Sequence, residues 1–183
     1  MSDLRFYTFV NFYLSSIQQG VQSFHVLHEM FNKYHAIALN ISLRDDQKLA
    51  ASKRLRDWST NHKTLIVLNG GANADIEDTY YKLEELSRSL SFPLPFAKFN
   101  EDSKSLGGII TACGCVLPQE IYEAVDFRKA SDLLDARAFM PQSTYEAREC
   151  FFFINDNVIT ARYLPGTAEH ELIALLKSCS LAR

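Results

Sequence analysis

Four polar side chains that could do chemistry recur at helical spacing near the start of the chain. They are Gln18, Gln22, His25 and Glu29, at successive steps of four, three and four residues. This spacing places them in one line along a helix whose other positions are largely apolar. The line follows an aromatic, strand-like run, and mixed α/β proteins usually place their chemistry at such strand-to-helix junctions. We therefore expect a functional site at the start of this first helix.

The elements that must position this site are predicted to alternate between strand and helix over residues 1–125. Apolar and β-branched runs predict strands at residues 5–13, 36–42, 64–68, 96–99 and 109–116. Apolar residues at steps of three and four predict helices at 15–34, 45–58 and 75–90, and a short helix is expected after Pro118. The continuous apolar run of residues 64–68 is typical of a strand covered on both faces. Alternation of this kind predicts an α/β fold of three layers, with a mixed, mostly parallel sheet and helices on both faces.

The character of the chain changes after residue 127. We expect residues 1–127 to form the α/β domain and residues 128–183 to form an appendage packed on it. A short helix at residues 131–140, a β-hairpin at 150–163 and a last helix at 168–179 are predicted there. Phe151, Phe152 and Phe153 present aromatic rings to both faces of the first hairpin strand. They would pack within the chain or form a homo-oligomer contact, and the sequence leaves both open.

Composition excludes several classes of protein. The chain has 183 residues, 47% of them hydrophobic, and a formal net charge of −3, which argues against a dedicated nucleic-acid-binding domain. No run of 18 apolar residues is present, and the N-terminus has no pattern of a secretory signal, so we expect a cytoplasmic protein with no membrane span. Cys113 and Cys115 flank Gly114 in an apolar run, which predicts two buried thiols on one face of a strand. No ligand spacing for zinc follows them, so neither a metal nor a cofactor is expected.

In one short motif and in element order, the chain resembles the type II peptidyl-tRNA hydrolases. That family opens with a strand, a loop and a helix that carries the pattern Gly-Lys-x-Ala-Ala-Gln-x-x-His. The residues Gln22-Ser23-Phe24-His25 match the end of this pattern, and the order of elements matches over residues 4–126, with Trp58 before the strand at 64–68. The family's lysine falls on Gln18. Its acidic loop, Asp-Ala-Gly-x-Thr, falls on residues 101–105, where Glu101 stands for the acid and Ser105 for the threonine.

The resemblance implies hydrolysis of the ester that joins a peptide to tRNA, in a site between the first helix and the loop of residues 101–105. Such a reaction needs an activated water and a group that stabilises the oxyanion. Glu101 would orient or deprotonate the water, while Gln18 and Ser105 would donate or accept hydrogen bonds. Binding of tRNA or a nucleotide would then fall to Gln22, His25, Asp102 and Lys104.

A glutamine in place of the family's lysine leaves an alternative open. Gln18 has no charge with which to hold a phosphate or a developing oxyanion, although Lys104 would supply a cation from the neighbouring loop. The alternative is a non-catalytic module of the same fold that binds a nucleotide, an RNA end or a protein partner. The site residues also have structural explanations, because glutamine favours helices, histidine is often hydrogen-bonded in a structural role, and loop acids are usually solvated.

Overall fold

The computed structural model of the chain describes residues 3–39, 45–133, 149–156 and 158–182. The chain divides into two compact units. The first comprises Asp3–Leu117 and Cys179–Arg183, and the second comprises Pro118–Ser178. The division expected after residue 127 thus lies at Pro118, where the last strand of the first unit ends and a short helix begins.

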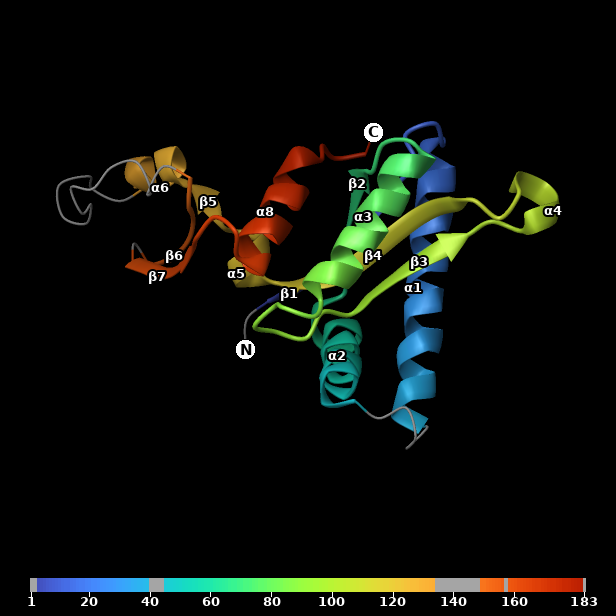
Figure 1. Cartoon of the computed structure of the whole chain (residues 1–183), viewed down its shortest axis with the longest axis horizontal. Coiled ribbons are helices and arrows are strands. Elements are labelled where there is room, and N and C mark those ends of the chain that lie inside the picture. Colours follow the sequence, from blue (N-terminus) through green and yellow to red (C-terminus); the bar gives the residue numbers. More distant parts are fainter. Residues whose placement is uncertain (1–2, 40–44, 134–148, 157, 183) are drawn as a thin grey trace. The chain divides into compact units, whose positions relative to one another are not determined.

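The first unit combines strands and helices, but the predicted alternation is interrupted, because α1, α2 and η2 follow one another in the element order with no strand named between them (Figure 1). Its elements are β1 (Leu4–Val10), α1 (Ser16–Leu39), α2 (Asp46–Asp57), the π-helical turn η2 (Trp58–His62), β2 (Thr64–Asn69), α3 (Asn73–Leu86), β3 (Phe96–Asn100), α4 (Ser103–Leu106) and β4 (Ile110–Pro118). Asp45 caps α2 by accepting a hydrogen bond from the Gln47 backbone N–H over 2.9 Å. An acid at this position also favours the positive end of the helix dipole.

The four strands of this unit form a sheet in the order β2-β1-β4-β3. Strands β1 and β2 pair in parallel, and β3 and β4 pair antiparallel. Strands β1 and β4 are also antiparallel. At one end of the pair the Asn11 N–H, just after β1, donates to Thr111 O, and further along β4 a Cβ on Gly114 would lie 2.7 Å from Tyr7 O. Residue numbers therefore fall along β1 in the direction in which they rise along β4.

The expectation of a mostly parallel sheet is therefore wrong, and the sheet is mixed. A parallel pair requires a crossover of roughly a dozen residues or more, usually with a helix. Residues 101–109, which connect β3 to β4, hold only the one-turn helix α4 and cannot carry the chain back to the other end of the sheet. The short connection forces a hairpin-like, antiparallel return.

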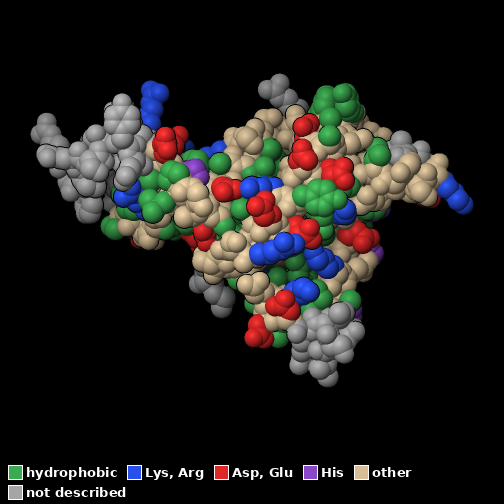
Figure 2. Space-filling view, in the orientation of Figure 1, with side chains coloured by type: hydrophobic (Ala, Val, Ile, Leu, Met, Phe, Trp, Pro, Cys, Tyr) green, Lys and Arg blue, Asp and Glu red, His purple; other side chains and the backbone are tan. Residues whose placement is uncertain are grey.

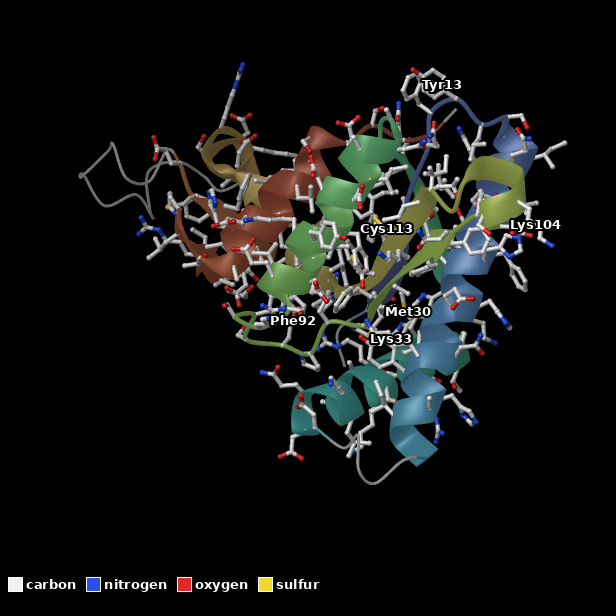
Figure 3. All side chains as sticks on the ribbon, turned by 45° about the vertical axis from the view of Figure 1, so that its right-hand side comes forward. Tyr13, Met30, Lys33, Phe92, Lys104 and Cys113 are labelled. Atoms are coloured by element: carbon white, nitrogen blue, oxygen red, sulfur yellow. The ribbon has the colours of Figure 1, made fainter. Side chains whose placement is uncertain are left out.

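Helices cover both faces of this sheet, as predicted. On one face, α1 and α2 pack on β1 and β4 around Phe6, Val26, Met30 and Trp58, and the labelled Met30 points from α1 toward the sheet in Figure 3. The Phe6 and Trp58 rings lie 5.4 Å apart. On the other face, the Cys113 thiol of β4 lies 3.7 Å from the backbone oxygen of Ile76 in α3.

Helix α1 is longer than the sequence pattern predicts. It continues to Leu39, so the strand expected at residues 36–42 is wrong for the part that the structure describes, and residues 40–44 lie outside the described ones. Met30, Tyr34 and Ile37 are all buried, at steps of four and three. The apolar period of the helix thus persists beyond Tyr34, and burial of Ile37 in the same core favours the helix over the strand.

Strand β2 differs from the buried strand that its apolar run predicts. It lies at the edge of the sheet, and Thr64 and Leu65 are exposed. The end of the chain covers part of this edge, since the Asn69 N–H donates to Ser180 O over 2.8 Å and the Ala182 N–H donates to Val67 O over 3.0 Å. Covering an edge in this way reduces the number of unpaired strand groups that another chain could pair with.

The second unit is built on a small antiparallel sheet in the order β5-β6-β7. Its elements are α5 (Gln119–Tyr122), β5 (Val125–Asp126), α6 (Phe127–Leu133), β6 (Phe151–Asn155), β7 (Val158–Tyr163) and α8 (Ala168–Ser178). The predicted hairpin is confirmed, whereas the helix expected at residues 131–140 begins earlier, and residues 134–140 lie outside the described ones. Among the residues described, no helix is both long and apolar enough to cross a membrane.

The three phenylalanines of β6 divide between the two faces of the small sheet. Phe152 is buried in a cluster with Val125 and Cys150, while Phe151 and Phe153 are half-buried. The alternation follows from the two-residue period of a strand. A homo-oligomer contact through this hairpin stays a prediction.

Candidate functional site

The centre of the candidate site is a chain of hydrogen bonds among Gln22, Glu101 and Thr111. The Gln22 amide Nε2 donates to Glu101 Oε1 over 2.6 Å, and its Oε1 accepts a hydrogen bond from the Thr111 hydroxyl over 2.8 Å. Gln22 is 8% exposed and Thr111 is 3% exposed, whereas Glu101 is half-buried. The carboxylate can only accept from the amide nitrogen, so these two partners fix the orientation of the Gln22 side chain.

Three elements far apart in sequence meet at this point. Gln22 comes from the second turn of α1, Glu101 follows β3, and Thr111 lies near the start of β4. The register of β3 and β4 shifts here, because Phe99 pairs with Ala112 and Asn100 pairs with Ile110, which leaves Thr111 as the extra residue of a β-bulge. A bulge turns a side chain away from the regular alternation of its strand, and here it accompanies the contact of Thr111 with α1.

The loop between β3 and β4 holds Glu101 beside α1. The Glu101 N–H donates to Ile109 O over 3.0 Å and closes the loop at its base. Gly107 and Gly108 follow with φ of 67° and 75°, a left-handed conformation that glycine adopts without the steric penalty of a side chain. The turn chemistry of the loop thus decides where the carboxylate of Glu101 lies.

Asp102 and Lys104 lie on the same loop but make local contacts. Asp102 caps α4 by accepting a hydrogen bond from the Lys104 N–H over 2.9 Å. Both side chains are exposed, and Lys104 points outward from the tip of the loop in Figure 3. Ser105 belongs to α4, and its side chain lies outside the described residues. The loop therefore offers one acid bonded to α1, a second acid engaged in a cap, and an exposed ammonium.

Gln18 takes part in the start of α1. The N–H and the hydroxyl of Ser15 both donate to Gln18 Oε1 over 3.0 Å, and the Gln18 N–H donates to the Ser15 hydroxyl over 3.4 Å. This reciprocal arrangement is a capping box with glutamine at its third helical position. Gln18 is exposed and lies one turn before Gln22, and its side-chain oxygen is bonded to Ser15 at the start of the helix.

His25 packs on strand β3. Its ring is stacked on the ring of Phe99, with centroids 4.4 Å apart and planes 15° apart. The imidazole is half-buried, one turn after Gln22, and it covers part of the contact between α1 and β3. The predicted polar line thus divides: Gln22 reaches the acidic loop, His25 packs on a neighbouring ring, and Glu29 is exposed.

The sequence pattern missed polar residues at the carboxyl end of β1. Asn11 is buried there, its amide nitrogen donates to Asn73 Oδ1 of α3, and its oxygen accepts from the Tyr13 N–H over 2.9 Å. Thr8 and Ser23 form a buried hydroxyl pair at 2.8 Å between β1 and α1. The signal in the sequence is a polar residue in or directly after an aromatic strand, such as Asn11 after Val10, but it does not name the partner.

The apolar residues at the start of α1 point away from the core. Ile17, Val21 and Phe24 are 82%, 48% and 64% exposed, although their spacing of four and three predicts a buried face. Phe12 and Tyr13 lie exposed in the loop just before the helix, with ring centroids 3.8 Å apart, and Tyr13 points outward in Figure 3. An uncommon row of exposed apolar side chains therefore borders the candidate site.

No metal site accompanies these residues in the part of the chain that is described: no three His, Cys, Asp or Glu side chains there are grouped to hold an ion. The predicted burial of Cys113 and Cys115 is confirmed, and burial raises the pKa of both thiols well above the usual range. Buried, protonated thiols are poor nucleophiles and poor metal ligands.

Neither the models of known protein families nor the curated protein sequences match this chain.

Proposed function

We propose that the first unit hydrolyses the ester of peptidyl-tRNA at the site formed by Gln22, Glu101 and Thr111. The observation that carries the proposal is the 2.6 Å hydrogen bond from Gln22 to Glu101. It joins the Gln-x-x-His segment to the acidic loop, the two segments on which the resemblance to type II peptidyl-tRNA hydrolases rests. Without that meeting, no shared site would exist.

Glu101 would act as the general base in this proposal. The Gln22 amide holds one carboxylate oxygen in place, while half-burial leaves the carboxylate within reach of solvent. A carboxylate fixed in this way can orient a water molecule and take its proton as the water attacks the ester carbon. Positioned acid–base catalysis of this kind contributes typically about 10²–10⁴-fold to a rate.

The developing oxyanion needs donors or a positive charge, and Gln18 supplies no charge. The start of α1 offers backbone N–H groups and the positive end of a helix of 24 residues. In this proposal the helix start takes the place of the lysine that the family carries at the position of Gln18. The exposed ammonium of Lys104, which points outward from the neighbouring loop, would attract the phosphates of the tRNA.

A second candidate function is binding of an RNA end without hydrolysis. It is favoured by the exposed rings of Phe12, Tyr13 and Phe24, which lie before and along the first turns of α1. Unpaired bases of RNA are commonly held by stacking on such rings, which contributes about 1–3 kcal/mol for each base. The same rings would hold the single-stranded end of a tRNA in the hydrolase.

The test compares turnover of a peptidyl-tRNA by the wild type, Glu101→Gln and the control Glu77→Gln. Glutamine at 101 keeps an oxygen that accepts from Gln22 but cannot act as a base, so the rate should fall about 10²–10⁴-fold. Glu77 is exposed on α3, and its replacement changes charge by the same amount without touching the site. If the wild type does not turn over peptidyl-tRNA, the proposal that this protein is a hydrolase is wrong. Tight binding of the tRNA end that Tyr13→Ala weakens would then support the second function.

A further inference from the structure

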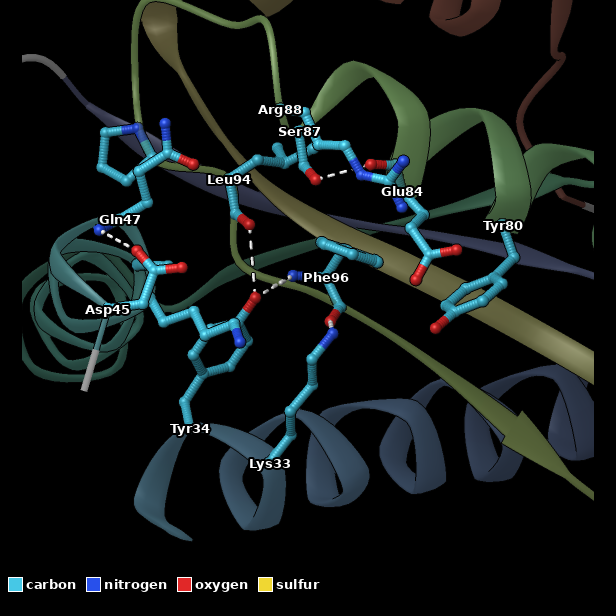
Figure 4. Close-up of a pocket in the computed structure, with 13 residues that line it drawn as sticks. Lys33, Tyr34, Asp45, Gln47, Tyr80, Glu84, Ser87, Arg88, Leu94 and Phe96 are labelled. Carbon is cyan, nitrogen blue, oxygen red and sulfur yellow. Dashed lines mark hydrogen bonds between the residues drawn. The ribbon is translucent and has the colours of Figure 1, made fainter. Parts of the chain in front are cut away.

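A separate cavity lies in the first unit, away from the candidate site. It is an open hollow with a volume of about 500 Å³, bordered by α1, the start of α2, the end of α3 and the segment before β3 (Figure 4). In Figure 2, Lys and Arg side chains gather around a hollow between α2 and α3, with hydrophobic atoms exposed inside it. Its lining is polar and apolar in about equal parts, and its size lies in the range of sites for small molecules.

The charged groups of the cavity carry an excess of positive charge. Lys33, Lys48 and Arg88 line it together with the acids Asp45 and Glu84. The carboxylate of Asp45 is engaged in the cap of α2, where it accepts from the Gln47 N–H. The cap leaves the charge of Asp45 in place, so three cations face two acids, and an anion entering the cavity would meet one net positive charge.

Lys33 is the innermost of the three cations. Its ammonium donates to the backbone oxygen of Phe96 over 3.0 Å and lies 3.7 Å from the centre of the Phe96 ring. An ammonium has three hydrogens, so one hydrogen bond leaves capacity for a ligand. The pKa of Lys33 is lowered to about 8, chiefly by burial, while Glu84 opposes the shift and Lys48 adds to it. This charge is poorly solvated in the free protein, and an anionic ligand would compensate it.

The apolar wall of the cavity is held rigidly. The buried Tyr34 hydroxyl donates to Leu94 O over 3.3 Å and accepts from the Phe96 N–H over 3.2 Å, so it fixes the backbone of the segment that enters β3. The Tyr80 ring completes the wall, 5.8 Å from the Phe96 ring and tilted by 49°. A wall already formed in the free protein lowers the cost of ordering when a ligand binds.

We propose that this cavity binds a small organic anion that joins a phosphate or carboxylate group to a planar, largely apolar body. Lys33, Lys48 and Arg88 hold the anionic group, and the rings of Tyr80 and Phe96 contact the body. The apolar wall distinguishes this site from one for an inorganic anion, and the excess of cations distinguishes it from one for a neutral apolar compound.

Calorimetric titration of the full chain with four probes tests the proposal. Adenosine 5′-monophosphate and indole-3-acetate carry a ring with a phosphate or a carboxylate, adenosine lacks the anion, and inorganic phosphate lacks the ring. At least one of the ring anions should bind at least tenfold more tightly than adenosine or phosphate, and the preferred one identifies the anionic group. Absence of binding by both ring anions up to about 1 mM, or equal binding of all four probes, overturns the proposal.

Charge reversal at the rim provides a matched pair of variants. The double variant Lys48→Glu/Arg88→Glu should weaken binding of the ring anion at least tenfold. The control Lys53→Glu/Lys82→Glu makes the same charge change on α2 and α3, at positions outside the cavity lining, and should leave binding within about twofold. Both Lys48 and Arg88 are exposed, so their replacement should not unfold the chain. An equal loss in both variants would mean non-specific attraction and would contradict the assignment.

A pH profile tests the role of Lys33. The groups that face it are Lys48, Arg88, Asp45, Glu84 and Tyr80, from α2 and α3. A bound anion favours the charged ammonium, so the dissociation constant of indole-3-acetate should rise about fivefold to tenfold between pH 7 and pH 9. Lys33→Met should bind more weakly at pH 7 and lose this rise. A wild-type profile that is flat, or one that Lys33→Met retains, would exclude Lys33 from the site.

Discussion

Replacement of Thr111 by valine tests the hydrogen-bond chain on which the candidate site depends. Valine keeps the β-branched shape of threonine and removes the hydroxyl that donates to Gln22 Oε1 over 2.8 Å. Both residues are buried, so water cannot readily replace the lost donor. A buried acceptor left without a partner costs about 1–3 kcal/mol, and we expect Thr111→Val to lower the free energy of unfolding by that amount.

A double-mutant cycle with Gln22→Met separates this hydrogen bond from other effects of the substitution. Methionine removes the acceptor, so Thr111→Val should cost little in that background. The difference between the two costs, which is the coupling energy of the pair, should be about 1–2 kcal/mol. Thr79→Val is the matched control, because Thr79 is a buried threonine of α3 that takes no part in this hydrogen-bond chain.

Fluorescence of Trp58 during urea denaturation measures these free energies. It is the single tryptophan of the chain, and it is buried in the core of the first unit, which contains the site. A loss of 1 kcal/mol should also lower the melting temperature by about 2–4 °C in a chain of this size. A coupling energy below about 0.3 kcal/mol would refute the reasoning, because Gln22 and Thr111 would then not be bonded to each other in solution.

Three further predictions concern backbone, charge and thiol groups. Gly20→Ala should stabilise the chain by about 0.5–1 kcal/mol, because Gly20 lies inside α1 with open space around it. Gly114→Ala should destabilise the chain, because a Cβ there would lie 2.7 Å from a backbone oxygen of β1. Urea denaturation measures the free energy of unfolding of both variants. The pKa of Lys33 is about 8 in the folded chain against 10.5 in the unfolded one, so the unfolded state binds more protons between pH 8 and pH 10.5. The free energy of unfolding should therefore rise with pH over that range, and the rise should be smaller in Lys33→Met. An equal rise in the wild type and in Lys33→Met would contradict the lowered pKa. Iodoacetamide should label Cys179, the half-exposed thiol, faster than the buried Cys113, as measured by mass spectrometry of the native protein, and equal labelling would count against the packing of β4.

The sequence predicts most of the local structure of the first unit. The aromatic run predicted as a strand at residues 5–13 forms β1 as far as Val10, the acids Asp45 and Asp46 begin α2, and the run from Thr64 forms β2. These elements are set by local preferences: alternation or apolar runs for strands, and caps and periodicity for helices. The burial of Cys113 and Cys115 likewise follows from an apolar strand in the middle of a sheet.

Sequence patterns fail where apolar side chains have helical spacing but do not face the core. Ile17, Val21 and Phe24 have the spacing of a buried helix face, yet the face that packs on the sheet carries Gln22 and Ser23. Periodicity identifies the faces of a helix but does not say which of them meets the rest of the chain. In α1 the inward face near the site is polar because its side chains find hydrogen-bond partners on β1, β4 and the loop after β3.

The candidate site was predictable in part. Of the predicted line of Gln18, Gln22, His25 and Glu29, Gln22 contacts the acidic loop through its hydrogen bond to Glu101, and whether the line serves a function stays a prediction. Thr111 gave no signal, because a threonine within an apolar strand is an ordinary strand residue. Its contact with Gln22 depends on a bulge that exists only once β3 and β4 are paired.

The sequence by itself determined where most helices and strands of the first unit begin, since caps, periodicity and turn residues act over a few positions. Only the tertiary structure decided which helix face is buried, that the sheet is mixed, and that Gln22, Glu101 and Thr111 meet. It also decided that Lys33 and Tyr80 line one cavity. These outcomes depend on contacts between residues tens of positions apart, and local preference carries no information about the partner that each side chain will find.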